Sequence, residues 1–196
     1  GGGGFMIVHL AESGQTLALD YRETAPAAAF RDMFLADDGE PDPALSRDSP
    51  LASGVPGTVA GLISAHERFG TIPLKELMAP AIRLARDGFV IGQGLERSLI
   101  KAGRDGRLKQ TAKSVFFKEI GEPYRAGERL LQPHLADSLE RIANNGHAGF
   151  YTGPTAEAIV KTLAGDGGLM TLEDLAGYEP IWREPVIGSY RDFDVF

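Results

Sequence analysis

The sequence predicts an α+β fold in which helices dominate. Apolar, strand-like runs stand near the start of the chain, a helical period begins after Gly57, and strand-like runs return near the end. With 196 residues, the chain is long enough for one domain with a real core. We therefore expect a single domain over residues 1–196, with a strand hairpin in 1–30, a mainly helical part in 57–175 and a second strand hairpin in 178–196.

The first hairpin is predicted from two short apolar runs, residues 5–10 and 16–21, with polar turn residues between them. Two such runs joined by a short polar connection are typical of antiparallel strands. The following segment, residues 37–56, is rich in Asp, Pro, Ser and Gly and is expected to be a long irregular loop.

The helical part is predicted from hydrophobic residues at three- and four-residue spacing. A helix after Gly57 would bury one face, made of Val59, Leu62, Ile63, His66 and Phe69.

A second helix is expected to run to Gly88, with Thr71 as its cap and Pro80 kinking or splitting it, because proline removes a backbone hydrogen bond. Further helices are expected in 94–102, 133–143 and 155–163. Thr171 and Asp174 have the spacing of a capping box, which predicts a short helix from Leu172.

The second hairpin is predicted from strand-like residues 179–190 and 193–196, with a turn at Arg191 and Asp192. Pro180 and Pro185 cannot donate to a strand ladder, which favours an edge position or a bulge.

Composition excludes several classes of protein. The net charge is −7 and no long basic run appears, so no nucleic-acid partner is expected. The chain has no cysteine, which excludes disulfides, thiolate metal sites and a cysteine nucleophile. No apolar run approaches about 18 residues, so no membrane span is expected. The four histidines, His9, His66, His134 and His147, lack the spacing of helical zinc ligands, and we expect neither a metal site nor a cofactor.

Two features near the start can be interpreted in more than one way. Gly1–Gly4 could be a linker or cloning remnant, a structural element, or a nest of backbone N–H groups that binds an anion. Arg22 could form an ordinary surface ion pair with Asp20 or Glu23. Alternatively, its planar guanidinium could clamp a carboxylate through two parallel hydrogen bonds.

A series of motifs favours the second interpretation of Arg22, because together they resemble γ-glutamyltranspeptidases. The opening GGGGFM with Asp20–Pro26 (DYRETAP) resembles the start of that family's core domain. Further blocks follow in the family's order: SGVPGTVAGL at 53–62, PAIRLA and DGF at 80–89, LQP at 131–133, FYTG at 150–153, GL and TLEDL at 168–175, and REP with YR at 183–191.

The resemblance implies an N-terminal nucleophile hydrolase with an αββα sandwich, of which this chain would be a helix-rich, partial domain from the middle of the large subunit. Such a precursor cleaves itself, and the N-terminal Thr of the small subunit attacks a γ-glutamyl amide. No residue of this chain matches that nucleophile. Arg22 matches the arginine that binds the α-carboxylate of the donor.

The resemblance also implies two partners, a small γ-glutamyl substrate such as glutathione and the small subunit of the same precursor. The chain alone is expected to be inactive and to self-associate. A periplasmic or secreted location is expected, with the signal segment outside this sequence.

Two alternatives remain open at this point. A cephalosporin-acylase-like or polyglutamate-processing enzyme would share the scaffold, since substrate choice depends on residues elsewhere. A binding module that kept the scaffold and lost the nucleophile would not be an enzyme at all.

Overall fold

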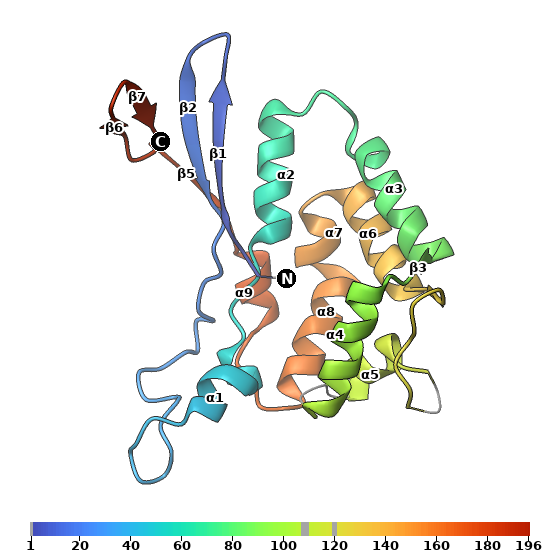
Figure 1. Ribbon diagram of the computed structural model, residues 1–196. Helices are drawn as coiled ribbons and strands as arrows, with labels where there is room; N and C mark the ends of the chain where they lie inside the picture. The colour runs from blue at the N-terminus through green and yellow to red at the C-terminus, as the bar shows by residue number, and fades with distance from the viewer. Residues whose placement is uncertain (1, 107–109, 119–120) are drawn as a thin grey trace. The chain divides into compact units, whose positions relative to one another are not determined.

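The computed structural model describes residues 2–106, 110–118 and 121–196 (Figure 1). Its contacts divide the chain into two compact units, Gly1–Thr71 with Asn145–Phe196, and Ile72–Asn144. Helices prevail and the strands form small antiparallel sheets, so the predicted α+β class is confirmed. No helix of the described residues is long and apolar enough to cross a membrane.

The first unit contains one three-stranded antiparallel sheet in the order β1-β2-β5. Its strands are β1 (Phe5–Leu10), β2 (Gln15–Asp20) and β5 (Ile181–Arg183). The predicted N-terminal hairpin is present, with Met6 opposite Leu19, and Leu19 is in turn opposite Trp182. Cross-strand partners share a face of a sheet, so these three residues form the inner face, on which Leu19 is fully buried.

Helix α2 (Thr58–Phe69) covers this inner face (Figure 1). The ring of Trp182 meets Phe69 edge-on, with centroids 5.6 Å apart, and its Nε1–H donates to Ser64 Oγ at 3.0 Å. The predicted face of α2 was partly wrong. Ala60, Gly61 and Ile63 are buried, whereas Leu62 is 50% exposed. The helix packs closely against Tyr21, at the end of β2, through Gly61. A prediction based on hydrophobic side chains gives no weight to a glycine.

The remaining elements of the first unit lie in the long connection after β2 and in the C-terminal part. The predicted loop at 37–56 contains helix α1 (Pro43–Asp48), capped by the Asp42 side chain, and one 3₁₀ turn. The C-terminal elements are α7 (Ala148–Tyr151), α8 (Gly153–Ala164), α9 (Leu172–Ala176), β6 (Gly188–Tyr190) and β7 (Phe193–Val195).

The C-terminal strands differ from the expected arrangement. The run 179–190 is interrupted between β5, which joins the first sheet, and β6, which pairs with β7 across the predicted turn at Arg191 and Asp192. Pro185 lies in this interruption, where its missing N–H costs no ladder bond.

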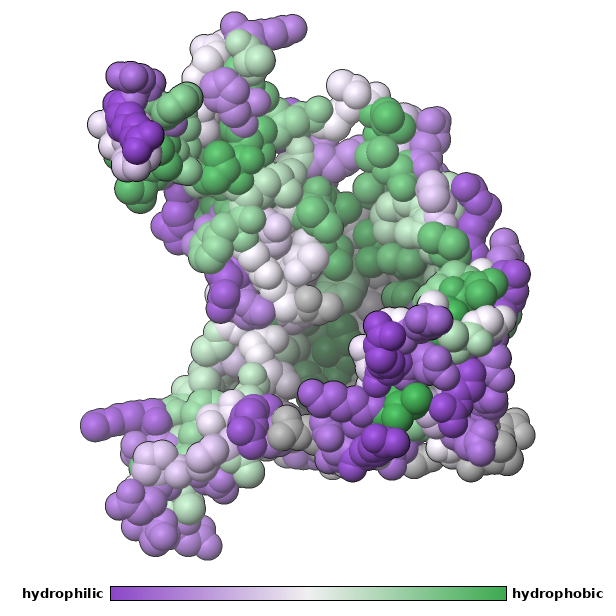
Figure 2. Space-filling model, viewed as in Figure 1, coloured by the Kyte–Doolittle hydropathy of each residue, from purple (hydrophilic) through white to green (hydrophobic). Residues whose placement is uncertain are grey.

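The core of the first unit joins both ends of the chain. Tyr151, Leu175, Tyr178 and Val55 are almost completely buried there, and the helices α2, α8 and α9 contribute Ala60, Ala156 and neighbouring apolar residues. Figure 2 shows that hydrophobic residues also reach the surface around β1, β2 and the β6–β7 hairpin.

The second unit is built from α3 (Leu74–Asp87), β3 (Phe89–Val90), α4 (Gln93–Arg104), α5 (Gln110–Phe116), β4 (Arg129–Leu130) and α6 (Pro133–Asn145), whose last residue belongs to the first unit. Arg86 joins α3 to α6 through ion pairs with Asp137 and Glu140, both at 2.9 Å. Ile91, Leu99 and Leu130 form its buried cluster.

Two features of helix α3 bear on its prediction. The helix is continuous through Pro80, although the proline lacks an N–H for the carbonyl of Glu76, so Pro80 does not split it. It also begins after Pro73 with no side-chain cap, so Thr71 does not cap it.

Candidate functional site

Arg22 lies two residues after the end of β2, and its side chain is 62% exposed. Its Nε is 3.2 Å from a carboxylate oxygen of Glu23, and its guanidinium carbon is 6.0 Å from the centre of the Phe5 ring. The ion pair expected under the simpler interpretation is therefore present. An exposed pair of this kind contributes about 0–1 kcal/mol, so a better carboxylate partner can replace Glu23 at low cost.

Asp20 is already engaged by another arginine. Arg183 on the neighbouring strand donates to its Oδ2 from Nη2 at 2.9 Å and from Nε at 3.0 Å, while the backbone N–H of Arg22 donates to Oδ1 at 3.2 Å. The bond from the Arg22 N–H, followed by the bonds and charge of Arg183, outweighs partial desolvation and lowers the pKa of Asp20. Of the two acids next to Arg22 in sequence, the guanidinium of Arg22 therefore pairs with Glu23.

The glycine run fixes the backbone beside Arg22. Gly4 exchanges two hydrogen bonds with Tyr21, and Gly2 accepts bonds from the N–H groups of Gly57 and Thr58 at 2.8 and 3.1 Å. A Cβ on Gly3 would stand 2.7 Å from Arg22 Cα, closer than real contacts allow. These contacts give the run a structural role, since several of its polar groups already have partners within the chain.

A buried aromatic cluster lies behind this backbone. Tyr178, which follows α9, donates its hydroxyl to the carbonyl of Arg22 at 2.7 Å. Its ring stacks on Tyr151 with centroids 5.8 Å apart, and Tyr151 stacks on His147 at 4.2 Å. The His147 Nε2 lies 3.1 Å from the carbonyl oxygen of Tyr178. The rings thus connect the end of α9 with the start of α7.

The two tyrosine hydroxyls of this cluster stay protonated at neutral pH. Burial raises the pKa of Tyr151 to about 12, although the hydrogen bond from the Ala60 N–H acts to lower it. Burial, followed by the negative charges of Asp20 and Glu23, also raises the pKa of Tyr178. Both groups therefore act as neutral donors: Tyr151 donates to Pro56 O at 2.6 Å and accepts from Ala60 N–H at 3.1 Å.

The predicted capping box at α9 is confirmed. Thr171 Oγ1 accepts from the Asp174 N–H, and the Asp174 carboxylate accepts from the N–H and hydroxyl of Thr171, both at 2.9 Å. Asp174 Oδ1 also accepts from the N–H of Ala27 at 2.8 Å, a contact that the sequence did not predict.

The four histidines lie in separate elements of the chain. Among the described residues no group of three or more His, Cys, Asp or Glu side chains could hold a metal ion. His9 Nδ1 contacts Thr16 Oγ1 at 2.8 Å across β1 and β2, where both side chains are outside the core. His66 is half-buried, and His147 is the histidine that contacts the aromatic cluster.

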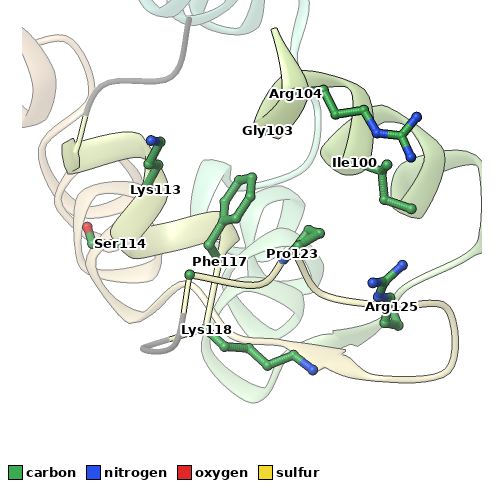
Figure 3. Close-up of a pocket in the computed structure, with 10 residues that line it drawn as sticks. Ile100, Gly103, Arg104, Lys113, Ser114, Phe117, Lys118, Pro123 and Arg125 are labelled. Carbon is green, nitrogen blue, oxygen red and sulfur yellow. The ribbon is translucent and has the colours of Figure 1, made fainter. Parts of the chain in front are cut away.

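A cavity of about 720 Å³ lies in the second unit, between α4, α5 and the loop that follows α5 (Figure 3). Phe117 is central to it, and Arg104, Lys113, Lys118 and Arg125 bring positive charge to its lining. Lys118 pairs with Glu128 at 2.6 Å and Arg125 approaches Glu96 at 3.7 Å. None of the residues singled out in the sequence lines this cavity.

A second cavity, of about 450 Å³, lies in the first unit against the aromatic cluster. Its lining includes Ser64, Glu67, His147 and Tyr178, but not Arg22. The sequence analysis singled out Arg22 and the acids beside it, but it did not predict the cluster of Tyr178, Tyr151 and His147. Apolar spacing could place these three in a core, but it carries no signal for a bond between residues 156 positions apart.

Comparisons with known proteins agree on one family. The family described as "Gamma-glutamyltranspeptidase" matches residues 1–196. The glutathione hydrolase proenzyme of Escherichia coli K12 is 47% identical over 197 residues, which cover 100% of this chain and 34% of that protein. This chain thus spans about a third of the length of the curated relatives it matches.

Solved structures show the same likeness in three dimensions. The γ-glutamyltranspeptidase of Helicobacter pylori superimposes with a TM-score of 0.95 at 44% identity, covering 100% of this chain and 56% of that one. A cephalosporin acylase from Bacillus halodurans is more distant, with a TM-score of 0.79 and 25% identity over 97% of this chain and 36% of its own. The predicted fold, a helix-rich α+β piece of an N-terminal nucleophile hydrolase, is confirmed, and the chain belongs to the γ-glutamyltranspeptidase family.

Proposed function

We propose that this chain is part of the large subunit of an enzyme that transfers or hydrolyses γ-glutamyl groups of glutathione and related amides. In this enzyme Arg22 binds the α-carboxylate of the donor. Family membership supports the reaction class, and the E. coli relative is itself named a glutathione hydrolase. The similarity to γ-glutamyltranspeptidases exceeds that to the acylase in both identity and TM-score, which favours a γ-glutamyl donor over a cephalosporin.

The single observation that carries the proposal is the state of Arg22. Its backbone packs against Gly3 and accepts a hydrogen bond from Tyr178, while its guanidinium is exposed and pairs through Nε with Glu23 at 3.2 Å. A donor carboxylate offers two oxygens to the planar fork, and hydrogen bonds to charged groups contribute about 1.5–3 kcal/mol. That gain exceeds the value of the exposed pair with Glu23.

In the proposed reaction, this chain orients the donor and leaves the bond changes to other residues. The hydroxyl of an N-terminal Thr in the small subunit attacks the γ-amide carbonyl, and its proton passes to the α-amine of the same residue. The amine of the cleaved γ-amide takes up that proton and leaves. The γ-glutamyl group, now an ester of the Thr, is then transferred to water or to an acceptor amine. Arg22 acts through position, because a held α-carboxylate fixes the distance of the γ-carbonyl from the nucleophile.

Arg22→Ala in the complete, self-processed enzyme tests the clamp. The value of kcat/KM for a γ-glutamyl donor is expected to fall roughly 10- to 100-fold, the equivalent of the bonds lost at 1.4 kcal/mol per tenfold. Arg22→Lys should restore only part of the lost kcat/KM, since an ammonium cannot form the two parallel hydrogen bonds of a guanidinium. A donor without the α-carboxylate should respond little to either change.

Arg31→Ala is the matched control, because Arg31 is an arginine of the same unit whose side chain is 96% exposed and faces Asp32 at 3.8 Å. It should leave both donors unaffected. Equal losses for both donors in Arg22→Ala would assign Arg22 a structural role and remove the clamp.

We also propose that the two units are parts of one partial domain and that the small subunit of the same precursor completes the site. The name proenzyme, carried by the E. coli relative, and the third of its length that this chain spans support this view. The family resemblance supports a periplasmic or secreted location for the complete protein.

A further inference from the structure

We propose that Tyr178 is a positioning residue for Arg22: it holds the main-chain carbonyl of Arg22 and thereby aims the guanidinium at the donor carboxylate. This inference rests on the proposed clamp. It adds a residue from the far end of the chain to a site that the sequence located only in the DYRETAP block.

The carrying observation is one partly buried hydrogen bond. The Tyr178 hydroxyl donates to the Arg22 carbonyl at 2.7 Å, within the usual range for an O–H···O bond. Tyr178 is only 5% exposed, so packing holds the ring that carries this hydroxyl. The bond therefore constrains the peptide group that follows the Cα atom from which the Arg22 side chain departs.

Close packing leaves the Tyr178 hydroxyl little room to move. A Cβ on Gly57 would stand 2.1 Å from the hydroxyl oxygen and 2.1 Å from the carbonyl oxygen of Tyr21. Only a glycine at position 57 lets the tyrosine pass between α2 and the strand end. A Cβ on Gly3 would likewise collide with Arg22 Cα at 2.7 Å. The Arg22 backbone is thus packed closely against Gly3 and hydrogen-bonded to Tyr178.

Tyr178 is itself held by contacts with Tyr151 and His147. It stacks on Tyr151 with an angle of 8° between the ring planes, and its backbone carbonyl lies 3.1 Å from His147 Nε2, which donates when that nitrogen carries the proton. Thr171 and Asp174 cap the start of α9, and this helix ends two residues before Tyr178. The hydroxyl is therefore pre-organised, and its removal should change the aim of Arg22 more than the fold.

Tyr178→Phe in the complete enzyme tests the inference. For a donor with an α-carboxylate, KM should rise about fivefold, which corresponds to about 1 kcal/mol at 1.4 kcal/mol per tenfold. The value of kcat should fall by a smaller factor than KM rises, because Tyr178 acts on the donor through Arg22. A donor that lacks the α-carboxylate should show an unchanged KM.

Tyr151→Phe is the matched control. It removes a hydroxyl from the same ring stack, but that hydroxyl bonds to Pro56 O and Ala60 N–H and not to Arg22. Both variants should lower the melting temperature, whereas only Tyr178→Phe should distinguish the two donors. If both variants raised KM selectively for the carboxylate donor, or if neither did, the positioning role of Tyr178 would be wrong.

A graded replacement keeps the test decisive if Tyr178→Phe fails to mature. 4-Aminophenylalanine at position 178 preserves the ring and one donor, but an N–H bond is longer and weaker than the phenolic one. The KM of this variant for the carboxylate donor should lie between the KM values of the wild type and of Tyr178→Phe. If Tyr178→Phe cannot be measured, the KM of this variant should be moderately higher than that of the wild type. An unchanged KM with this residue would count against the inference.

The outcomes separate the two levels of the proposal. If Arg22→Ala affects both donors alike, the clamp fails and the positioning role fails with it. If Arg22→Ala is selective for the carboxylate donor and Tyr178→Phe is not, the clamp stands and only the role of Tyr178 is wrong.

Discussion

Asp174 shows how one side chain can serve two segments that are far apart in sequence. Its Oδ2 accepts two bonds from Thr171 at the start of α9, and its Oδ1 accepts the Ala27 N–H, just after the DYRETAP block. Helix α9 leads into Tyr178, which bonds to Arg22. Asp174 and Tyr178 therefore make two parallel connections between the segment around Arg22 and the segment around α9.

The charge of Asp174 predicts an acid-dependent contribution to stability. Desolvation raises the pKa of this carboxyl, but the N–H bonds from Ala27 and Thr171 and the Thr171 hydroxyl lower it by more, so its pKa lies below the ordinary 3.8. A group with a lowered pKa stabilises the folded state above its unfolded pKa, and this contribution is lost as the pH falls through the folded pKa.

Asp174→Asn should therefore destabilise the protein at neutral pH, and the difference from wild type should shrink below about pH 4. Urea unfolding between about pH 2.5 and pH 7 measures it. Thr171→Ala removes the cap hydroxyl and leaves the carboxylate, and it should lower the free energy of unfolding by about 1 kcal/mol. A difference for Asp174→Asn that stays constant over the whole range would show that shape, not charge, matters at this position.

At the residue scale, the sequence predicted the acids around Arg22 and the capping box because both are local patterns. The bond from Tyr178 and the bond to Ala27 join residues 156 and 147 positions apart, and no periodicity contains such a pairing. Arg22 itself was singled out by the family resemblance, since the charge pattern alone favoured an ordinary ion pair.

At the scale of elements, the contact between α2 and β2 depends on a glycine. The Tyr21 ring lies against Gly61, and a Cβ there would stand 2.3 Å from Tyr21 Cγ. Gly61→Ala should therefore push the helix from the end of β2 and destabilise the protein by about 1–3 kcal/mol, the usual cost of overpacking. Thermal or urea unfolding of the complete protein measures the effect.

Gly94→Ala is the control for this prediction. Gly94 lies in the first turn of α4, with nothing within 4 Å of its added Cβ. Alanine is the better helix former by up to about 1 kcal/mol, so this variant should be neutral or stabilised. If both variants behaved alike, helix propensity and not the contact with Tyr21 would explain the result.

The predictions succeeded where elements are defined by local signals. The first hairpin follows from two short apolar runs and a polar turn, and α9 follows from its capping box. The buried face of α2 was misjudged because backbone proximity at Gly61, not hydrophobicity, sets how that helix packs. The sequence also left open a split of α3 at Pro80, which the structure does not have, because propensity alone takes no account of tertiary contacts such as Arg86 with Asp137 and Glu140.

At the scale of the whole molecule, the proposed division of labour predicts that this chain alone is inactive. By the family resemblance, the nucleophile and its base belong to the small subunit, while this chain contributes binding. The purified 196-residue chain should release no product from a γ-glutamyl anilide above a matched blank. Turnover that increases with the concentration of the chain and survives repeated purification would refute the division.

The strands of the first unit expose surface that favours association. Within the described residues, β1 and β5 each pair only with β2, so the sheet has two free edges. Apolar side chains stand out along β1, β5 and the C-terminal hairpin, with Val186 90%, Phe193 71%, Phe5 66% and Ile187 65% exposed. Free strand edges beside apolar side chains invite pairing with another chain. In the complete protein we expect the small subunit to cover this surface.

The isolated chain should consequently self-associate, and the C-terminal segment should contribute much of the contact. Sedimentation velocity over a range of micromolar concentrations should show species larger than the monomer. The double change Val186→Lys and Phe193→Lys should shift the distribution towards the monomer, because like charges replace apolar contacts. Leu84→Lys, at a 56% exposed position of α3, is the control and should have little effect. A wild-type chain that stays monomeric at high micromolar concentration would mean that these edges are protected within the chain itself. An equal response to Leu84→Lys would mean that general hydrophobicity, and not the strand surface, drives association.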